Sequence, residues 1–591
     1  MVKYLRIILA ITVAGLLSQI ILAGNYNNFD LAIYCRVYEV RQMSDISWLK
    51  NRIEYLEKHI KIGKVYLETY RDTILADRET ILKAKKYLEK KGIKVSGGIT
   101  LVRHEADRFK TFCYSNPGHL DEIKEIVAYT AGIFDEIILD DFFFTSCKCE
   151  LCVSKKGDRS WTEFRTALLK DVADNIIVKT ARGVNPDIKM IIKYPNWYEH
   201  YQYLGYNLEY EPEIFDMIYT GTETRDPEYT HQHLQPYQSY SIMRYLENAS
   251  HGKNAGGWVD PYARQYLDRY GEQILLTLFS KPEEITLFCL QNLVEEMKKE
   301  DGTTEYLSDV SPLAGYVLAK ADNFMNLLGE PAGIASYKPY HSSGEDFLHN
   351  YIGMLGIPVD LTADFPYEAN TILLSEAAKY DDAIVDKIKK QLMDGKTVVI
   401  TTGLLKALQG RGIEEIAQLR YTDKKALVHR FSNFRSVHVS ESDILIPQVL
   451  YPTNDCWEII TAYDEGNGYP LLLFTGYGKS RMYVLTVPDN SGDLYNLPEP
   501  VITMIKDVLM KDIYVRVESK ARISLFVYDN NTFIVHSFLP HTEPVKIVIK
   551  DRAVRLRELT GDRIIEGIQN GDVTEFSTFM LPHSYRVFKV E

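Results

Sequence analysis

Runs of basic residues are missing from this sequence. Its 81 Asp and Glu residues outnumber 68 Lys and Arg residues, and the formal net charge is -13. Proteins that bind nucleic acid need Lys and Arg to neutralise phosphates, so this balance argues against a nucleic-acid partner. A neutral substrate fits an acidic chain better.

Long apolar runs are also missing, except at the amino terminus. There, Lys3 and Arg6 precede the apolar stretch from Ile7 to Leu22, and Ala23-Gly24 offers a small-residue cleavage point. This pattern predicts a signal peptide over residues 1–23 and a secreted or periplasmic protein with no membrane attachment after cleavage. No Cys follows the run directly, which argues against a lipoprotein signal. An uncleaved membrane anchor is the alternative.

No glycine-rich phosphate-binding turn follows the first expected strand, which argues against a doubly wound open sheet. What is present is an alternation of apolar, strand-like runs with amphipathic helical segments. Eight such strands over about 300 residues predict an α/β fold whose first domain, residues 24–325, is a (β/α)8 TIM barrel. The expected strands cover residues 31–37, 64–70, 95–102, 136–141, 188–194, 215–220, 256–260 and 285–290.

The rest of the chain shows no nucleophile in a strand-to-helix elbow, no internal repeat and no low-complexity segment. Strands and helices alternate again over residues 326–511, which predicts a structural, flavodoxin-like α/β domain. From residue 512 the pattern changes to short alternating strands, with Asp529-Asn-Asn as a turn. This predicts a small C-terminal antiparallel β-sandwich over residues 512–591.

Polar residues follow most of the eight expected barrel strands, at the edge where barrel enzymes place their chemistry. Two adjacent carboxylates, Asp140 and Asp141, end the fourth strand. Paired carboxylates are the groups that hydrolyse glycosidic bonds, so we take Asp140 and Glu223 as the catalytic pair and Asp260 as a reserve. By strand parity Asp141 is expected to point away from Asp140. The residues expected to bind substrate are Arg36, Glu68, Arg103, His104, Asp141, Lys193, Trp197 and Trp258.

Aromatic residues are abundant, at 12% with 41 Tyr. They suit stacking on sugar rings, although a large aromatic core explains them equally well. A carboxylate after most strands, with Trp and Tyr among them, indicates a polyhydroxylated ligand. The sequence therefore predicts a glycoside hydrolase. The alternatives are a non-catalytic glycan-binding barrel, and a lyase or epimerase that uses His104 or Tyr70 as its base.

Cysteine is scarce, with seven residues, but three of them form the pattern C-x-C-x-x-C. Cys147, Cys149 and Cys152 follow the fourth strand, and Cys113 lies in the loop after the third. Loops after neighbouring barrel strands meet, so the four thiols can converge on a structural zinc ion. Secretion argues for disulfides instead, and free or mixed thiols are a third option.

The order of the three domains and the cysteine pattern resemble glycoside hydrolase family 42, the three-domain β-galactosidases. In that family one Cys after strand three and C-x-C-x-x-C after strand four form a zinc cluster, and Cys113, Cys147, Cys149 and Cys152 match it. The resemblance implies a structural zinc site, and a middle domain that mediates trimers implies a homo-oligomer, either a trimer or a dimer.

The expected active site departs from that family. Asp140-Asp141 stands where the family has Asn-Glu, and Asp260 stands where its nucleophilic Glu follows strand seven. The β-galactosidase activity therefore does not carry over. An Asp after strand four with an acid after strand six instead resembles the α-galactosidase-type clans. That likeness implies a retaining enzyme with Asp140 as nucleophile and Glu223 as acid/base, and we expect exo-acting cleavage.

Overall fold

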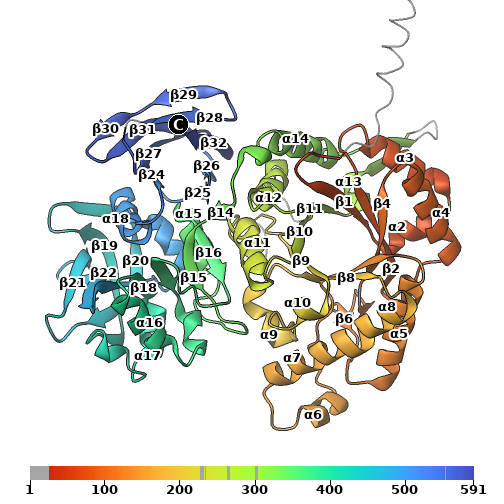
Figure 1. The fold of residues 1–591 in the computed structure, drawn as a ribbon, viewed down its shortest axis with the longest axis horizontal. Coiled ribbons are helices and arrows are strands. Elements are labelled where there is room, and N and C mark those ends of the chain that lie inside the picture. Colours follow the sequence, from red (N-terminus) through yellow and green to blue (C-terminus); the bar gives the residue numbers. More distant parts are fainter. Residues whose placement is uncertain (1–24, 227–231, 233, 263–265, 300–303, 553) are drawn as a thin grey trace, which may run out of the picture.

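The computed structural model describes residues 25–226, 232, 234–262, 266–299, 304–552 and 554–591. The predicted signal peptide lies outside these residues. The chain forms an N-terminal barrel, a middle α/β domain and a C-terminal pair of antiparallel sheets, which Figure 1 shows from red to blue. This is the predicted fold class.

Eight parallel strands close into the barrel, because β1 pairs with both β2 and β11. Their order around the barrel is β1-β11-β10-β9-β8-β7-β4-β2. All eight predicted strands are present, with ends that differ by a few residues. Their bounds are β1 Asp30–Cys35, β2 Lys64–Arg71, β4 Lys94–Ile99, β7 Glu136–Leu139, β8 Lys189–Tyr194, β9 Met217–Gly221, β10 Asn254–Val259 and β11 Glu284–Phe288.

Helices surround the barrel, and local sequence explains where several of them begin. The side chain of Asp77 caps the first turn of α4, Asn116 with Pro117 begins α5, and Ser160 with Glu163 forms a capping box on α7. The segment from α7 through η1 to α8 is continuous. The main helices are α2 Val37–Gln42, α3 Ile46–Leu56, α4 Arg78–Lys90, α5 Pro117–Ala131, α7 Trp161–Asp171, η1 Val172–Val178, α8 Lys179–Val184, α11 Gln238–Ala249, α12 Leu267–Phe279 and α14 Val310–Asp322.

Short helices and strands lie in the loops of the barrel domain. They are β3 Ile74–Leu75, β5 Val102–His104, β6 Lys110–Thr111, α6 Glu150–Lys156, η2 Tyr198–His200, α9 Tyr201–Leu204, α10 Glu211–Ile214, α13 Leu290–Leu293, β12 Glu295–Lys298, β13 Thr304–Leu307 and η3 Met325–Leu327. The loops that carry the candidate site lie among them.

Large aromatic side chains fill the barrel interior. Tyr34, Tyr66, Tyr219 and Trp258 form a buried cluster there. A Cβ atom on Gly98 would lie 2.5 Å from the Tyr34 hydroxyl. Glycine at this strand position therefore makes room for the Tyr34 ring in the barrel interior.

The middle domain is built on a nine-stranded sheet in the order β16-β15-β17-β18-β23-β22-β21-β19-β20. The half from β16 to β23 is parallel, as predicted, but β19 to β22 add an antiparallel half that the sequence analysis did not predict. The strands are β15 Ile334–Tyr337, β16 Val359–Thr362, β17 Thr371–Leu374, β18 Thr397–Thr401, β19 Arg420–Ser432, β20 Val437–Leu450, β21 Cys456–Tyr463, β22 Gly468–Tyr477 and β23 Ser480–Leu485. The helices are α15 Leu348–Met354, η4 Glu376–Tyr380, α16 Ile384–Met393, α17 Thr402–Leu408, η5 Ile413–Glu415, η6 Ser491–Asn496 and α18 Glu499–Leu509.

Two antiparallel sheets make the C-terminal domain, in the orders β14-β25-β26-β32-β28-β29 and β24-β27-β31-β30. One strand comes from far away in the sequence, because β14 from the segment after the barrel pairs with β25. The strands are β14 Pro331–Ala332, β24 Val515–Glu518, β25 Ile523–Tyr528, β26 Thr532–Ser537, β27 Glu543–Ile549, β28 Arg555–Glu558, β29 Arg563–Glu566, β30 Ile568–Asn570, β31 Val573–Met580 and β32 Ser584–Val590.

Polar side-chain contacts join the barrel to the other two domains. Lys338 of the middle domain lies 2.7 Å from Glu199 of the barrel, and both side chains are buried. His583 of the C-terminal domain contacts Glu272 on α12 at 3.2 Å. Among the described residues, no helix has the length and apolar character needed to cross a bilayer.

Candidate active site

A cavity of about 400 Å³ opens at the carboxyl ends of the barrel strands. We call it the barrel cavity. The residues that line it are Arg36, Arg71, Glu105, Phe109, Asp140, Asp141, Phe142, Lys193, Glu223, Arg225, Trp258, Asp260, Tyr262 and Phe288. Its size is that of ordinary small-molecule sites.

One ammonium group, that of Lys193 on β8, contacts three carboxylates in this cavity. Its Nζ lies 2.7 Å from Oδ2 of Asp141, 3.0 Å from Oε1 of Glu223 and 3.5 Å from Oδ1 of Asp140. The Lys193 side chain is 2% exposed. A buried cation of this kind keeps several acids close together that would otherwise repel each other.

Asp140 is the most firmly held of the three acids. Its Oδ2 accepts from Arg71 at 2.8 Å and from Thr100 at 3.2 Å, and its Oδ1 accepts from the backbone N–H of Asp141 at 2.9 Å. Burial opposes ionisation, but Lys193 and Arg71 outweigh it and lower the pKa of Asp140. Asp140 is therefore an ionised carboxylate at neutral pH.

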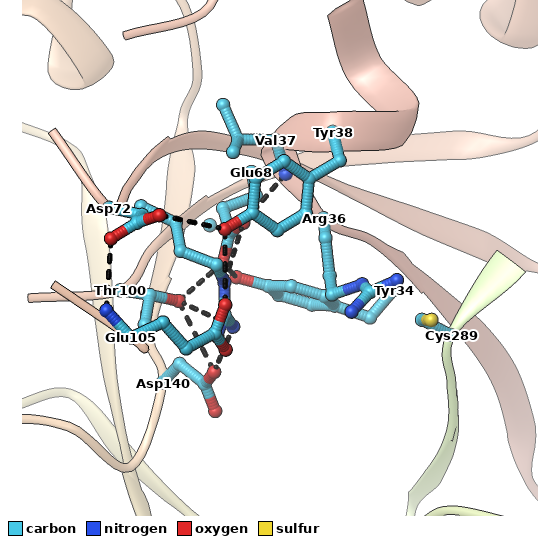
Figure 2. A network of polar contacts seen from close by, with 12 residues as sticks. Tyr34, Arg36, Val37, Tyr38, Glu68, Asp72, Thr100, Glu105, Asp140 and Cys289 are labelled. Carbon is cyan, nitrogen blue, oxygen red and sulfur yellow. Dashed lines mark hydrogen bonds and ion pairs between the residues drawn. The ribbon is translucent and has the colours of Figure 1, made fainter. Parts of the chain in front are cut away.

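Arg71 joins Asp140 to a second buried acid, Glu68, with 3.0 Å from its Nε to each carboxylate oxygen. Figure 2 shows Glu68, Thr100 and Asp140 gathered in this network. The hydroxyl of Tyr34 and the backbone N–H of Val37 also donate to Glu68, at 2.8 and 2.6 Å. Glu68 is completely buried beneath the cavity. It positions Arg71 and does not line the cavity.

Asp141 differs from its neighbour in exposure and in acidity. Its side chain is 19% exposed, whereas that of Asp140 is 3% exposed. Burial, together with the charges of Asp140 and Glu223, raises the pKa of Asp141 to about 7 despite Lys193. The expectation that Asp141 points away from Asp140 is wrong: strand β7 ends at Leu139, so strand parity does not apply to the two acids, and both reach Lys193.

Glu223 follows β9 and folds back over the end of that strand. A Cβ on Gly221 would lie 2.5 Å from Oε2 of Glu223, so glycine leaves space for this carboxylate. The side chain of Asn196 donates to the backbone carbonyl of Glu223 at 2.6 Å and fixes the turn. Burial and the charge of Asp260 raise the pKa of Glu223, against the opposing effect of Lys193. Glu223 thus has the tendency to hold a proton that a general acid needs.

Asp260 is engaged by another residue of the cavity. Its two oxygens accept from Arg225 at 3.1 and 2.9 Å in a bidentate pair, and Oδ1 also accepts from the backbone N–H of Tyr262 at 3.0 Å. This pairing makes Asp260 a wall of the cavity and a weaker candidate for proton transfer than Glu223.

Aromatic rings form the remaining walls. Trp258 lies under the Lys193 ammonium, which is 4.5 Å from the ring centre, and packs against Phe288 at 5.4 Å. Tyr262 contacts Phe288 at 6.0 Å, and Phe142 lies below the Arg71 guanidinium at 5.5 Å. Such rings accept the apolar face of a sugar while the carboxylates bind its hydroxyl groups.

The structure brings most of the predicted site residues together. Among the described residues, all three predicted catalytic acids and four of the predicted substrate-binding residues line the barrel cavity, the latter being Arg36, Asp141, Lys193 and Trp258. Arg103 lies outside it and pairs with His119 at 2.8 Å, and His104 is exposed. Trp197 packs among aromatic rings, 5.6 Å from Tyr206.

Arg71 is the main residue that the sequence analysis did not select. In a regular strand, residues three apart such as Glu68 and Arg71 point to opposite faces. The pairing of β2 with β4 shifts register between Glu68 and Tyr70, and this irregularity lets both side chains meet. Phe142 and Phe288 also line the cavity.

The four predicted metal-ligating cysteines converge on one point. The Sγ atoms of Cys113, Cys147, Cys149 and Cys152 all lie within 4.8 Å of one another, and Cys113 is 3.6 Å from both Cys149 and Cys152. All seven cysteines are free. Four thiolates at about 2.3 Å from a zinc ion are about 3.8 Å apart in a tetrahedron, so the cluster fits a structural metal ion.

Comparison with protein families places each domain. Residues 19–310 match the model of the probable glycosyl hydrolase catalytic domain, and residues 514–590 match that of the probable glycosyl hydrolase C-terminal domain. Residues 329–490 match the second domain of the uncharacterized protein SSO3021. That protein, from Saccharolobus solfataricus, is 25% identical over 541 residues, which cover 83% of this chain and 87% of the relative.

Solved structures share the fold at low sequence identity. A catalytic mutant of Gan42B, a GH42 β-galactosidase from G. stearothermophilus, superposes with a TM-score of 0.66 at 10% identity and covers 96% of this chain and 99% of its own. α-L-Fucosidase isoenzyme 2 from Paenibacillus thiaminolyticus gives a TM-score of 0.63 at 12% identity, covering 96% and 100%. The chain therefore carries the catalytic and C-terminal domains of the probable glycosyl hydrolases, and it is a glycoside hydrolase with a GH42-like fold.

Proposed function

We propose that this protein is a secreted or periplasmic, exo-acting, retaining glycoside hydrolase with Asp140 as nucleophile and Glu223 as acid/base. The observation that carries the proposal is the shared contact of both acids with Lys193. Their oxygens lie 3.5 and 3.0 Å from one Nζ atom, so they are at most about 6.5 Å apart, which admits the ~5–5.5 Å of a retaining pair.

The surroundings of each acid shift its pKa in the direction that its role requires. Asp140 is held ionised and attacks the anomeric carbon to form a glycosyl ester, while Glu223 gives its proton to the leaving oxygen. Glu223 then takes a proton from water, which attacks the ester and releases the sugar with its original configuration. Asp141 binds a sugar hydroxyl beside this pair.

The cysteine cluster supports a second part of the proposal. Cys113, Cys147, Cys149 and Cys152 would hold a structural zinc ion, which fixes the loop that follows Asp141. Thr111 supports the same loop by donating to the carbonyl of Phe144 at 3.0 Å. We also propose a homo-oligomer that forms through the middle domain, on the basis of the shared architecture with GH42 enzymes.

The lyase or epimerase alternative has less support. It requires His104 or Tyr70 as a base in the substrate cavity, and neither of these described residues lines the barrel cavity. Tyr70 is buried near Glu122, and burial raises its pKa well above the ordinary range, so it does not serve as a base at neutral pH.

A panel of aryl glycosides tests the proposal. Wild type hydrolyses at least one of them, and Asp140→Asn lowers kcat by at least about 10⁴-fold on that substrate. Glu223→Gln keeps more activity on substrates with good leaving groups than on substrates with poor ones. Added azide restores turnover by this variant and forms a glycosyl azide. Proton NMR of the first product reads the anomer: an inverted product rejects the retaining mechanism, and full activity of Asp140→Asn rejects the nucleophile.

A further inference from the structure

A second and larger cavity, of about 540 Å³, lies between the barrel and the C-terminal domain. We call it the interdomain cavity. Helices α12 and α14 form its barrel side, and β26, β32 and the turns at residues 559–560 and 583 form the other side, near the top centre of Figure 1. Its volume falls within the range of ligand sites. It shares no lining residue with the barrel cavity.

A buried polar cluster forms the base of this cavity. Glu272 on α12 contacts Arg269 at 2.7 Å, His583 at 3.2 Å and His536 at 3.5 Å. His536 is 1% exposed, and its Nδ1 has no hydrogen-bond partner within the part of the chain that the structure describes. A buried ring nitrogen without a partner is costly, and a ligand hydroxyl in the cavity would satisfy it.

Aromatic side chains form the walls. The ring of Tyr585 lies 5.7 Å from Phe324 and is nearly parallel to the ring of His536, at 6.4 Å and 9°. Tyr316 stands at the rim and is 60% exposed. Tyr316 and the half-buried Tyr585 offer apolar faces beside a polar base, which is the arrangement that a saccharide ring requires, with its C–H faces and its hydroxyl edge.

The charges that line the cavity compensate each other. Glu272 is paired with Arg269, and the rim carries one acid, Asp268, and one base, Lys320. The Lys320 ammonium lies 4.9 Å from the centre of the Tyr316 ring. An anionic or cationic ligand would therefore find no net opposite charge, so a neutral ligand fits best.

We propose that the interdomain cavity is a second saccharide site, which binds a neutral sugar ring against Tyr316 and Tyr585, above the polar base that His536 and Glu272 form. It would hold a distant part of a glycan, or a second glycan, while the barrel acts on its own substrate. The proposal does not depend on which acids perform catalysis, because none of them lines this cavity.

The test counts bound sugars in full-length protein. The reference is Asp140→Asn, which prevents turnover, titrated by calorimetry with β-1,4-linked trisaccharides of glucose, mannose and galactose, and with trigalacturonic acid. Asn323→Trp fills the rim of the cavity from an exposed position, and Asn326→Trp places the same side chain on η3 outside the lining. His536→Phe keeps an aromatic ring and removes both ring nitrogens.

We expect each chain of Asn323→Trp to bind one neutral trisaccharide molecule fewer than a chain of the reference or of Asn326→Trp does. His536→Phe is expected to weaken that same binding event at least about fivefold, with an unchanged circular dichroism spectrum. Trigalacturonic acid should not bind there. Equal stoichiometry in all variants, or no neutral probe bound outside the barrel, would overturn the proposal. Its failure leaves hydrolysis by the barrel acids untouched, because that is read from product formation.

Discussion

The Lys193 ammonium lies 2.7 Å from the Asp141 carboxylate, and the same nitrogen reaches Glu223 at 3.0 Å. A single buried cation thus balances acids from the ends of two different strands. The arrangement makes the lysine part of the charge balance of the site, whereas its place in the sequence indicates sugar binding.

Replacing Lys193 with Met is expected to leave a cluster of buried acids without their common cation. Removing one partner of a buried ion pair costs about 3–5 kcal/mol, so the free energy of unfolding should fall by an amount of that order. We also expect kcat/KM to fall at least about a hundredfold, because Asp140 would lose part of what keeps it ionised. Steady-state kinetics and urea denaturation measure both effects. Lys189→Met, at the exposed start of the same strand, is the control, and a fully active Lys193→Met would contradict this view.

The pH dependence of kcat/KM is expected to show a transition near pH 7 that belongs to Asp141. Burial raises the pKa of this carboxyl to about 7, so it is neutral below that pH and charged above it. Asp141→Asn should abolish the transition, whereas Glu105→Gln, which alters another acid of the barrel cavity, should keep it. A transition that persists in Asp141→Asn would assign it to a different group, with Glu223 first.

Gly221→Ala is expected to displace the carboxylate of Glu223, because the added Cβ would lie 2.5 Å from Oε2. The fold should tolerate this change better than catalysis does. We expect kcat to fall at least about tenfold, since catalytic groups act only within narrow positional limits. The matched control is Gly183→Ala on α8, where no atom lies within 4 Å of the new Cβ. Equal kcat values for the two variants would show that Glu223 needs no such space.

Metal analysis of the purified protein is expected to find about one zinc ion per chain, bound by four thiolates. Cys113→Ser removes one ligand and should lower both the zinc content and the melting temperature. Cys456→Ser, far along the chain in β21, should leave the zinc content unchanged. Plasma mass spectrometry and calorimetry provide the two measurements. Wild-type protein without zinc and without free thiols would point to disulfides.

Lys506 on α18 predicts a distinct pH dependence of stability. Its side chain is fully buried and donates to the Val517 carbonyl at 2.6 Å, and burial lowers its pKa to about 7. The unfolded lysine titrates near ~10.4, so between these values the unfolded chain binds the extra proton and stability rises with pH, by up to about 1.4 kcal/mol per unit. Lys506→Met should remove this rise, and exposed Lys511→Met should keep it. Parallel curves for wild type and Lys506→Met would refute the assignment.

The barrel could be predicted because its strands are buried on both faces and therefore read as apolar runs, as in Ile188 to Ile192. The antiparallel half of the middle sheet could not be predicted in this way. Strand β19 carries Arg420, Lys424 and Lys425 at exposed positions, and these charges hide the alternation that marks a strand.

The candidate site was likewise predictable only in part. Asp140, Glu223 and Asp260 were predictable because each closely follows a recognisable strand. The role of Glu68 was not, because it depends on the irregular pairing of β2, which turns Arg71 toward both Glu68 and Asp140. A pattern of residue types does not reveal a local shift in strand register.

Strand β14 affects the order in which parts of the chain can fold during synthesis. Pro331 and Ala332 pair with Tyr528 and Val527, which are synthesised almost two hundred residues later. The barrel can close early, but this short strand waits for its partner until the last domain has emerged. A fragment that begins at residue 512 would leave that edge of β25 uncovered, and exposed sheet edges promote association between chains. The C-terminal domain is thus best produced together with the segment after the barrel that supplies β14.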